Sequence, residues 1–497
     1  MIFAARKPEQ LETYFEQFRR NIVGIQQRYR TPYGEHRILY TDWTASGRLY
    51  EPIERKMLEA FGPFVGNTHS ESNVTGTSMT QAYHFAQKVI KEHVHAGPDD
   101  VLLHVGFGMT AAVNKLQRIL GLKVPERYRK SRGISKNQRP IVFVTHMEHH
   151  SNHTTWLETI AEVVVIRQTR EGLVDLNDLK KLLKKYRNRR MKIGSFTACS
   201  NVTGIQTPVH AMARLMHEHG GLCFVDFAAS APYVPVNMHP ADPFEKLDAI
   251  TFSPHKFLGG PGSSGVLIFD SHLYRLKSPD QPGGGTVLWT NPWGRHRFKP
   301  EIEEREDGGT PGFLQAIRAS LAIELKERMG VDEMARREEE LVRRIFQGLQ
   351  RIPALRVLAD NIQERLGIIS FYFDSLHYNL VVRLLNDRFG IQMRGGCSCA
   401  GTYGHYLLHV DKYTSKRVTD RIDHGDFSTK PGWVRMSIHP TTTDREVDEI
   451  LSALTQIGAK GLGWAEDYDY DAHANEYFHK TNRGQIQQSV EQWFRFS

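Results

Sequence analysis

Two short apolar segments, each followed directly by polar side chains, are the parts of this chain best suited to chemistry. The first reads LCFV and ends at a carboxylate, Asp226, and the second reads AITF and is followed by Ser253, His255 and Lys256. In an open α/β sheet, polar groups at the carboxyl ends of strands lie where ligands bind. The sequence therefore predicts a ligand site formed by the ends of these two strands.

Asp226 and Lys256 together have the chemistry that pyridoxal phosphate (PLP) requires. That cofactor needs a lysine amine for a Schiff base and an anionic partner for its pyridinium nitrogen. A glycine-dense run, FLGGPGSSG, follows Lys256 and indicates a tight turn at the same place. We therefore predict PLP as the cofactor.

A third strand end indicates where a phosphate would bind. Residues 106–111, GFGMTA, follow an apolar strand and open a helix, so they match the dinucleotide fingerprint in outline. That fingerprint also needs an acidic residue about 20 positions later, where this chain has a basic loop. A nicotinamide site is therefore not expected, but backbone amides at a helix N-terminus still bind phosphate, with Met109 and Thr110 as donors.

Histidine, cysteine and arginine side chains supply further candidates. His149, in MEHHSNHTTW, follows a strand and is placed to lie over a cofactor ring; the spacing of its neighbouring histidines does not predict a metal site. Cys399 lies in a glycine-rich segment, where an exposed thiol near positive charge can be a nucleophile. Arg435 has the planar guanidinium that suits a substrate carboxylate.

Composition limits the class of protein. The net charge of +8 comes largely from two basic runs, 126–139 and 180–192, but no nucleic-acid-binding module accompanies them, so specific nucleic-acid binding is not expected. No apolar run is long enough to span a membrane, and no signal-peptide core is found. Four cysteines do not form a disulfide framework, which favours a reducing compartment. We expect a cytoplasmic protein without a membrane segment.

The order of predicted elements indicates an α/β fold. Short apolar strands alternate with helical patterns between about residues 98 and 270, as in a mostly parallel sheet covered on both faces. A long helical stretch, 312–350, is interrupted near Gly330 and leads into a smaller α+β region. The predicted parts are a helical extension, a large domain, a small domain and a polar, aromatic tail, at 1–35, 36–320, 321–460 and 461–497.

Taken together, these motifs resemble the class V aminotransferase superfamily of fold type I PLP enzymes, and within it the cysteine desulfurase and selenocysteine lyase branch. The resemblance runs from YTDWTASGR (40–48) to about residue 457, and its most specific segment is SPHK, whose lysine lies 30 residues beyond Asp226. It implies a large doubly wound domain with a mostly parallel sheet and a smaller C-terminal α+β domain.

The resemblance also implies roles for individual residues. Lys256 carries the Schiff base and moves protons, Asp226 pairs with the pyridinium, and His149 stacks on the ring. The cofactor-binding residues that it implies are Gly108, Met109, Thr110, His149, Asn201, Asp226, Ala228, Ser253, His255, Lys256 and Thr310. Thr310 lies in a segment that, in such enzymes, reaches the phosphate of a partner subunit, so a homodimer is implied.

The same resemblance assigns the substrate residues. Arg435 matches the arginine that binds the carboxylate of a small amino-acid substrate, and the pattern R-x-G-x-x-C-A fits Arg394, Gly396, Cys399 and Ala400. Cys399 is then the thiol that takes sulfur from cysteine as a persulfide and leaves alanine. The resemblance also implies a sulfur-acceptor protein as a partner.

Two positions depart from the desulfurase pattern. Ala229 stands where desulfurases usually have a glutamine, and GTYGHYLL follows Ala400 in place of a proline-containing segment. A class V aminotransferase or another PLP lyase without a persulfide step is therefore the alternative with the same cofactor. The alternative from another class is a non-catalytic binding or regulatory protein with the same fold.

Overall fold

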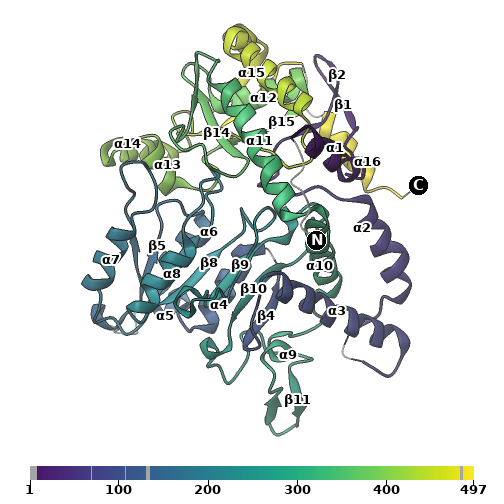
Figure 1. Ribbon diagram of the computed structural model, residues 1–497, viewed down its shortest axis with the longest axis vertical. Helices are drawn as coiled ribbons and strands as arrows, with labels where there is room; N and C mark the ends of the chain where they lie inside the picture. Colours follow the sequence, from purple (N-terminus) through teal and green to yellow (C-terminus); the bar gives the residue numbers. More distant parts are fainter. Residues whose placement is uncertain (1–7, 69, 107, 130–134, 482–484, 497) are drawn as a thin grey trace. The chain divides into compact units, whose positions relative to one another are not determined.

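The computed structural model describes residues 8–68, 70–106, 108–129, 135–481 and 485–496. They form two compact units, and each unit is assembled from separate parts of the chain (Figure 1). Unit 1 comprises residues 1–20, 24–43 and 337–497. Unit 2 comprises residues 21–23 and 44–336.

Unit 2 contains a seven-stranded sheet with the order β4-β10-β9-β8-β7-β5-β6. Strand β10 is antiparallel to both of its neighbours, whereas the other neighbouring strands are parallel. The strand bounds are Asp100–Val105 (β4), Ile141–Val144 (β5), Glu162–Val165 (β6), Lys192–Thr197 (β7), Leu222–Asp226 (β8), Ala249–Phe252 (β9) and Gly265–Asp270 (β10). The predicted α/β fold with a mostly parallel sheet is confirmed.

The apolar sequences of these strands match their burial. All four residues of β5, IVFV, have no exposed surface, as expected for a parallel strand covered on both faces. Helices α4 (Gly108–Ile119), α6 (His150–Leu157) and α8 (Val209–Glu218) contact the sheet (Figure 1). The loops that matter for the site are those joining the strand ends to these helices.

The basic run 180–192 begins in helix α7 (Leu176–Lys185) and ends at Lys192, the buried first residue of β7. Leu179 and Leu183 of this helix are buried, whereas Lys184 and Lys185 are exposed, which is the amphipathic pattern expected of a surface helix. In the other basic run, residues 130–134 lie outside the described residues, and helix α5 spans Glu126–Arg129.

Helix α10 (Phe313–Met329) packs against α3 (Val74–His93) in unit 2, with Tyr83 and Ile317 in the shared core. Gly330, with φ +78°, separates α10 from α11 (Val331–Leu349), so the predicted break at this residue is confirmed. A positive φ costs glycine little because it has no Cβ.

Unit 1 is built around a four-stranded antiparallel sheet with the order β13-β14-β17-β16. Its strands are Leu355–Val357 (β13), Ile368–Phe373 (β14), Arg394–Gly396 (β16) and Trp433–Ser437 (β17). Its main helices are α12 (Tyr378–Phe389) and α15 (Asp444–Trp464). The N-terminal strand β3 (Leu39–Tyr40) pairs in parallel with β15 (Ile391–Gln392), so residues before the large sheet belong with the C-terminal part of the chain.

The segment after α15 forms a hairpin of β18 (Tyr468–Asp471) and β19 (Glu476–His479). The other regular elements are α1 (Pro8–Arg19), β1 (Arg28–Thr31), β2 (Gly34–Arg37), α2 (Glu51–Arg55), a π-helix (Lys56–Phe61), β11 (Val287–Thr290), β12 (His296–Phe298), α9 (Ile302–Glu306), α13 (Gly401–Leu407), α14 (Lys412–Asp423) and α16 (Gln485–Trp493), with short 3₁₀ turns between them. Among the described residues, no helix combines the length and apolar character that a membrane span requires.

One buried carboxylate, that of Glu446, connects the N-terminal and C-terminal segments of unit 1. Glu446, in the first turn of α15, forms a capping box with Thr443 and accepts two hydrogen bonds from Arg19, at 2.7 and 2.8 Å. Arg37 donates a third bond at 2.9 Å. Burial alone would raise the pKa of Glu446, but the two guanidinium groups outweigh it and lower that pKa. The carboxylate is therefore ionised and fully paired.

Replacing Glu446 with alanine should leave two guanidinium groups without their shared anion. Loss of one partner from a buried ion pair costs about 3–5 kcal/mol, so the free energy of unfolding should fall by that amount. Urea unfolding of the full chain, followed by circular dichroism, measures it. Glu449→Ala is the matched control, because Glu449 also pairs with Arg37 but its side chain is 41% exposed, and its loss should cost less than about 1 kcal/mol. Equal losses in the two variants would contradict the assignment.

Candidate active site

Asp226 is a buried carboxylate at the end of β8. Its Oδ1 accepts a hydrogen bond from the backbone N–H of Ala228 at 2.8 Å, and the residue is 5% exposed. Burial raises the pKa of Asp226 to about 6, while the Ala228 N–H and the charge of Lys256 oppose this rise. The charge of Lys256 therefore acts on this buried carboxylate.

The strand register explains this arrangement. Asp226 of β8 pairs with Thr251 of β9 in a parallel ladder, so both strands end at the same edge of the sheet. The residues after β9 form a 3₁₀ turn, Pro254–Lys256, with Ser253 immediately before it. His255 and Lys256 are half-buried in this turn. Burial, with the neighbouring lysine, lowers the pKa of His255 to about 4, so its imidazole is neutral at physiological pH.

Gly108, Met109 and Ser253 form a cradle at the start of α4. The N–H of Met109 donates to Ser253 Oγ at 2.8 Å. Gly108 has φ +63°, and a Cβ on it would lie 2.8 Å from Ser253 Oγ and 3.0 Å from His255 Cε1. A side chain would therefore fill the space between the helix N-terminus and these two polar groups. Such a cradle has the chemistry of an anion site.

His149 and Thr110 are linked through Ser151. The N–H of Ser151 donates to His149 Nδ1 at 3.1 Å, and the hydroxyls of Ser151 and Thr110 share a hydrogen bond of 2.6 Å. His149 is the N-cap of α6, which fixes the start of this helix beside the start of α4. The structure therefore joins two residues that the sequence placed in the site only by type and position.

Glu148 is a residue that the sequence analysis missed. Its Oε1 accepts from the N–H and hydroxyl of Thr145 and from the N–H of Thr197, and its Oε2 accepts from Asn152. Burial raises the pKa of this carboxyl to about 7, against the effect of these hydrogen bonds. The network ties the ends of β5 and β7 to α6 directly before His149. The available signal was a carboxylate four residues after the apolar strand IVFV and directly before His149.

Lys326 was also missed, because it lies in a helix far along the chain. It is 3% exposed, and its ammonium donates to the carbonyl of Ala231 at 2.7 Å and to that of Val234. Burial lowers the pKa of Lys326 to about 7. The bonds anchor α10 to the turn that follows Asp226. Two other predicted residues, Ala228 and Asn201, are buried in the loops after β8 and β7.

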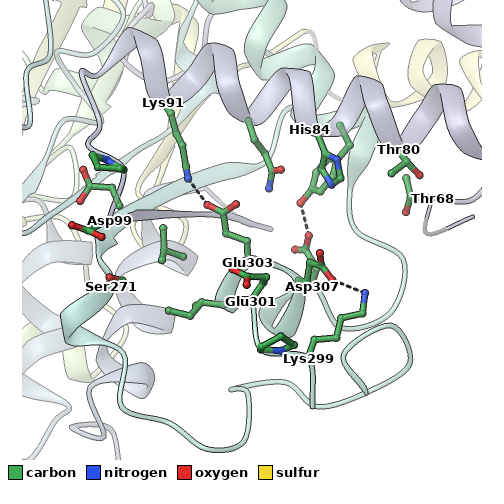
Figure 2. A pocket seen from close by; sticks show the side chains of 18 of the residues that line it. Thr68, Thr80, His84, Lys91, Asp99, Ser271, Lys299, Glu301, Glu303 and Asp307 are labelled. Carbon is green, nitrogen blue, oxygen red and sulfur yellow. Dashed lines mark hydrogen bonds and ion pairs between the residues drawn. The ribbon is translucent and has the colours of Figure 1, made fainter. Parts of the chain in front are cut away.

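Thr310 lies in the segment between α9 and α10. It is exposed, and its hydroxyl donates to Asn67 Oδ1 at 3.3 Å. A cavity of about 670 Å³ lies in unit 2, beside α3 and the segment 299–307. Figure 2 shows the side chains that line it. Tyr83 donates to Asp307 at 2.8 Å there, and Lys91 pairs with Glu303. No predicted site residue lines this cavity.

In unit 1, the two predicted arginines share one carboxylate. Arg394 of β16 and Arg435 of β17 are direct cross-strand partners. Asp42 Oδ1 accepts from an Nη of Arg435 at 2.7 Å, and Asp42 Oδ2 accepts from Nε of Arg394 at 2.9 Å. Arg435 is 3% exposed, and burial lowers the pKa of its guanidinium while Asp42 and Cys399 oppose that effect. The sequence analysis did not find Asp42.

The thiol of Cys399 is exposed in a tight loop between β16 and α13. Ser398 and Cys399 have φ values of +50° and +54°, a left-handed conformation that costs about 1–2 kcal/mol per residue when a Cβ is present. The hydroxyl of Ser398 accepts a hydrogen bond from the indole of Trp433 at 3.2 Å, which anchors the loop to β17. Cys397, two residues earlier, is half-buried. Strain of this kind is found at functional sites.

Among the described residues, no group of three His, Cys, Asp or Glu side chains could hold a metal ion. His149 and His150 are close, with ring centroids 6.3 Å apart, and Nδ1 of His149 accepts the N–H of Ser151. What the two units offer is therefore a buried anion, a lysine and an anion cradle in unit 2, and paired arginines and an exposed thiol in unit 1.

The position of Gly108 depends on the close approach of its backbone to that of Gly265, and this contact can be tested through stability. A Cβ on Gly265 of β10 would lie 2.4 Å from the carbonyl oxygen of Gly108. Gly265→Ala should therefore force the two backbones apart and lower the free energy of unfolding by about 1–3 kcal/mol. Gly106→Ala is the control, because a Cβ there meets no atom within 4 Å. A Gly265→Ala variant as stable as the control in urea unfolding would refute the tight approach.

Comparison with known proteins gives a consistent result. The family model described as aminotransferase class-V matches residues 39–450. The chain is 27% identical over 372 residues to a probable cysteine desulfurase of Halalkalibacterium halodurans, covering 73% of this chain and 84% of that protein. It is 26% identical over 424 residues to a probable cysteine desulfurase of Pyrococcus abyssi, covering 84% and 94%.

Solved structures show the same fold. A cysteine desulfurase from Thermococcus onnurineus, in its apo form, is 23% identical with a TM-score of 0.71, over 92% of this chain and 99% of that one. A cysteine desulfurase from Escherichia coli, in an S-sulfonic acid form, is 22% identical with a TM-score of 0.68, over 91% and 98%.

Proposed function

Because the chain belongs to the class V aminotransferase family, we propose that it is a PLP-dependent enzyme that takes sulfur from L-cysteine and leaves alanine. The observation that carries this proposal is the arrangement in unit 2. There Gly108 and Met109, at the start of α4, lie against Ser253 and His255, next to the strand end that holds Asp226 near Lys256. The desulfurase names of the relatives support the choice of reaction.

The residues present fit PLP. The Gly108 cradle, with Met109, Thr110, Ser253 and His255, would hold its phosphate, and the buried Asp226 carboxylate would stabilise a protonated ring nitrogen. His149 would cover the ring, and Lys256 would bind the aldehyde group. When bound, PLP supplies an electron sink for the substrate's α-carbon. Asn201 and Ala228 would line the same pocket.

Asp226 is suited to this role because its charge is buried. With a pKa of about 6 it is an anion at neutral pH, and few competing donors reduce its effect on a cation placed beside it. Lys256 would hold a proton at Nζ and transfer it to the substrate carbon.

Unit 1 would supply the substrate and sulfur-transfer groups. Arg435, with Arg394 beside it, would bind the substrate carboxylate, and the Cys399 thiolate would attack the substrate sulfur. The Sγ–S bond forms as the substrate's Cβ–S bond breaks, and the Cβ carbon then takes a proton to give alanine. The exposure of Cys399 supports this role, because the persulfide must afterwards reach an acceptor.

We also propose an oligomeric state, a partner and a compartment for the enzyme. The exposed Thr310 would reach the phosphate site of a second copy, in a homodimer, and an acceptor protein would take the persulfide sulfur from Cys399. Four free cysteines support a reducing compartment, so we place the enzyme in the cytoplasm.

Lys256→Ala should abolish the visible absorption band of the purified protein. The band depends on covalent attachment of PLP through the lysine, so the variant should also retain the cofactor less well on gel filtration. Lys181→Ala, an exposed lysine of α7, should keep the wild-type band. A colourless wild-type protein that takes up no added PLP would refute the assignment.

Cys399→Ser and Cys397→Ser form a matched pair for the sulfur-transfer step. A serine hydroxyl cannot accept sulfur. The rate of sulfide release from cysteine should therefore fall at least about 100-fold in Cys399→Ser. Cys397→Ser should stay within about threefold of wild type. Sulfide and alanine are measured together with cysteine as substrate. Equal activity of the two variants would rule out a persulfide on Cys399.

The second candidate is an aminotransferase or lyase that has no persulfide step. Ala229 and the GTYGHYLL segment favour it, because both depart from the desulfurase pattern. A panel of small amino acids, scored for sulfide, alanine and keto acids, separates the candidates. Keto-acid formation that is unaffected by Cys399→Ser would support the alternative.

A further inference from the structure

Asp42 has no role in the proposal above, yet its carboxylate contacts both substrate arginines. Arg394 and Arg435 are direct partners across antiparallel strands, where two like charges destabilise the sheet. Asp42 places one oxygen on each of them, at 2.9 and 2.7 Å. We call these three residues the charge cluster. Its members all belong to unit 1.

The position of Asp42 is fixed by backbone bonds rather than by its side chain. The residues just before it pair with β15, as Leu39 with Ile391 and Tyr40 with Gln392. Thr41 then donates to Gln392 and accepts from Ser437, at 3.1 and 2.7 Å. These bonds place Asp42 beside Ser437, the last residue of β17, and the side chain of Asp42 is 12% exposed.

The charge cluster has a formal net charge of +1, from two guanidinium groups and one carboxylate. The nearby His439, which stacks on Trp43 at 4.3 Å, adds no charge, because burial lowers the pKa of His439 to about 3. Cys399 lies close enough for its charge to act on Arg435. Asp42 contacts the same guanidinium at 2.7 Å, so its negative charge opposes the charge that Arg435 exerts at the thiol.

We propose that Asp42 is a positioning residue with two effects. It holds the guanidinium groups of Arg394 and Arg435 in place, and it reduces their combined charge to +1. Cys399 and the substrate carboxylate are therefore exposed to the field of one net positive charge. The inference rests on the proposed function for the roles of Cys399 and Arg435. One excess charge matches one carboxylate, so a bound amino acid neutralises the cluster. Without Asp42, the same anion would meet two uncompensated cations.

The test measures the electrostatic potential at Cys399 directly. Sulfonatoethyl methanethiosulfonate is an anion, and trimethylammonioethyl methanethiosulfonate is a cation; both modify exposed thiols. All variants carry Cys397→Ser, so that Cys399 is the thiol left in the loop, while Cys199 and Cys223 are buried. Peptide mass spectrometry follows the adduct on Cys399. The readout is the ratio of the anionic to the cationic reaction rate.

Asp42→Asn should raise this ratio on the order of tenfold, from opposite changes of about threefold in the two rates. Asp42→Glu should restore the ratio to within about twofold of the parent, since the charge returns. Asp448→Asn, which removes one carboxylate partner of Arg344 on the surface of unit 1, should leave the ratio unchanged. High salt should reduce the difference between Asp42→Asn and the parent.

A ratio unchanged in folded Asp42→Asn would overturn the proposal. So would a parallel rise in both rates, because that result indicates a loosened loop and not a change in charge. If Asp42→Asn does not fold, Arg394→Gln provides the test: its side chain is 52% exposed, and its loss should lower the ratio by a similar factor. No change in that variant would also overturn the proposal.

The result is separable from the proposed function. Thiol modification needs neither PLP nor turnover, so a charge effect of Asp42 would remain if the protein released no sulfide from cysteine. Conversely, sulfide release with an unchanged reagent ratio would support the desulfurase assignment and remove the role of Asp42.

Discussion

The parallel register of β7, β8 and β9 is the constraint on which the site in unit 2 depends. Parallel strands end at one edge of a sheet, so residues that follow different strands meet there. The pairing of Asp226 with Thr251 sets the carboxylate beside the turn that holds Ser253, His255 and Lys256. A shift of one residue in this register would turn every side chain to the opposite face.

Burial then gives these groups their chemical character. Asp226 has a raised pKa because it is almost out of contact with water, and Glu148 has one for the same reason. Each is held by backbone N–H donors, so neither can move to solvent without leaving those donors unpaired. Lys326 also holds this region in place, because its hydrogen bonds to two carbonyl groups fix the turn after Asp226.

In unit 1, the antiparallel sheet brings two like charges together. Here the ladder places Arg394 opposite Arg435, and the repulsion between them is relieved by a carboxylate from the start of the chain. Glu446 does the same for Arg19 and Arg37 near α15. In both places a buried ion pair joins a segment near the N-terminus to the C-terminal part of the chain, and both segments belong to unit 1.

The sequence by itself determined the fold class, the strand ends and the types of residue available there. Apolar runs followed by Asp226 or by SPHK are local patterns, and local patterns report which elements form and what ends them. The break at Gly330 was readable for the same reason. The tertiary structure decided what depends on pairing between distant segments: the contact of Gly108 with Ser253 and His255, the network of Glu148, and the insertion of Asp42 between two arginines. Asp42 lies about 350 residues before Arg394 in the chain, and no local periodicity predicts a long-range ion pair, because its geometry is set by strand register and burial.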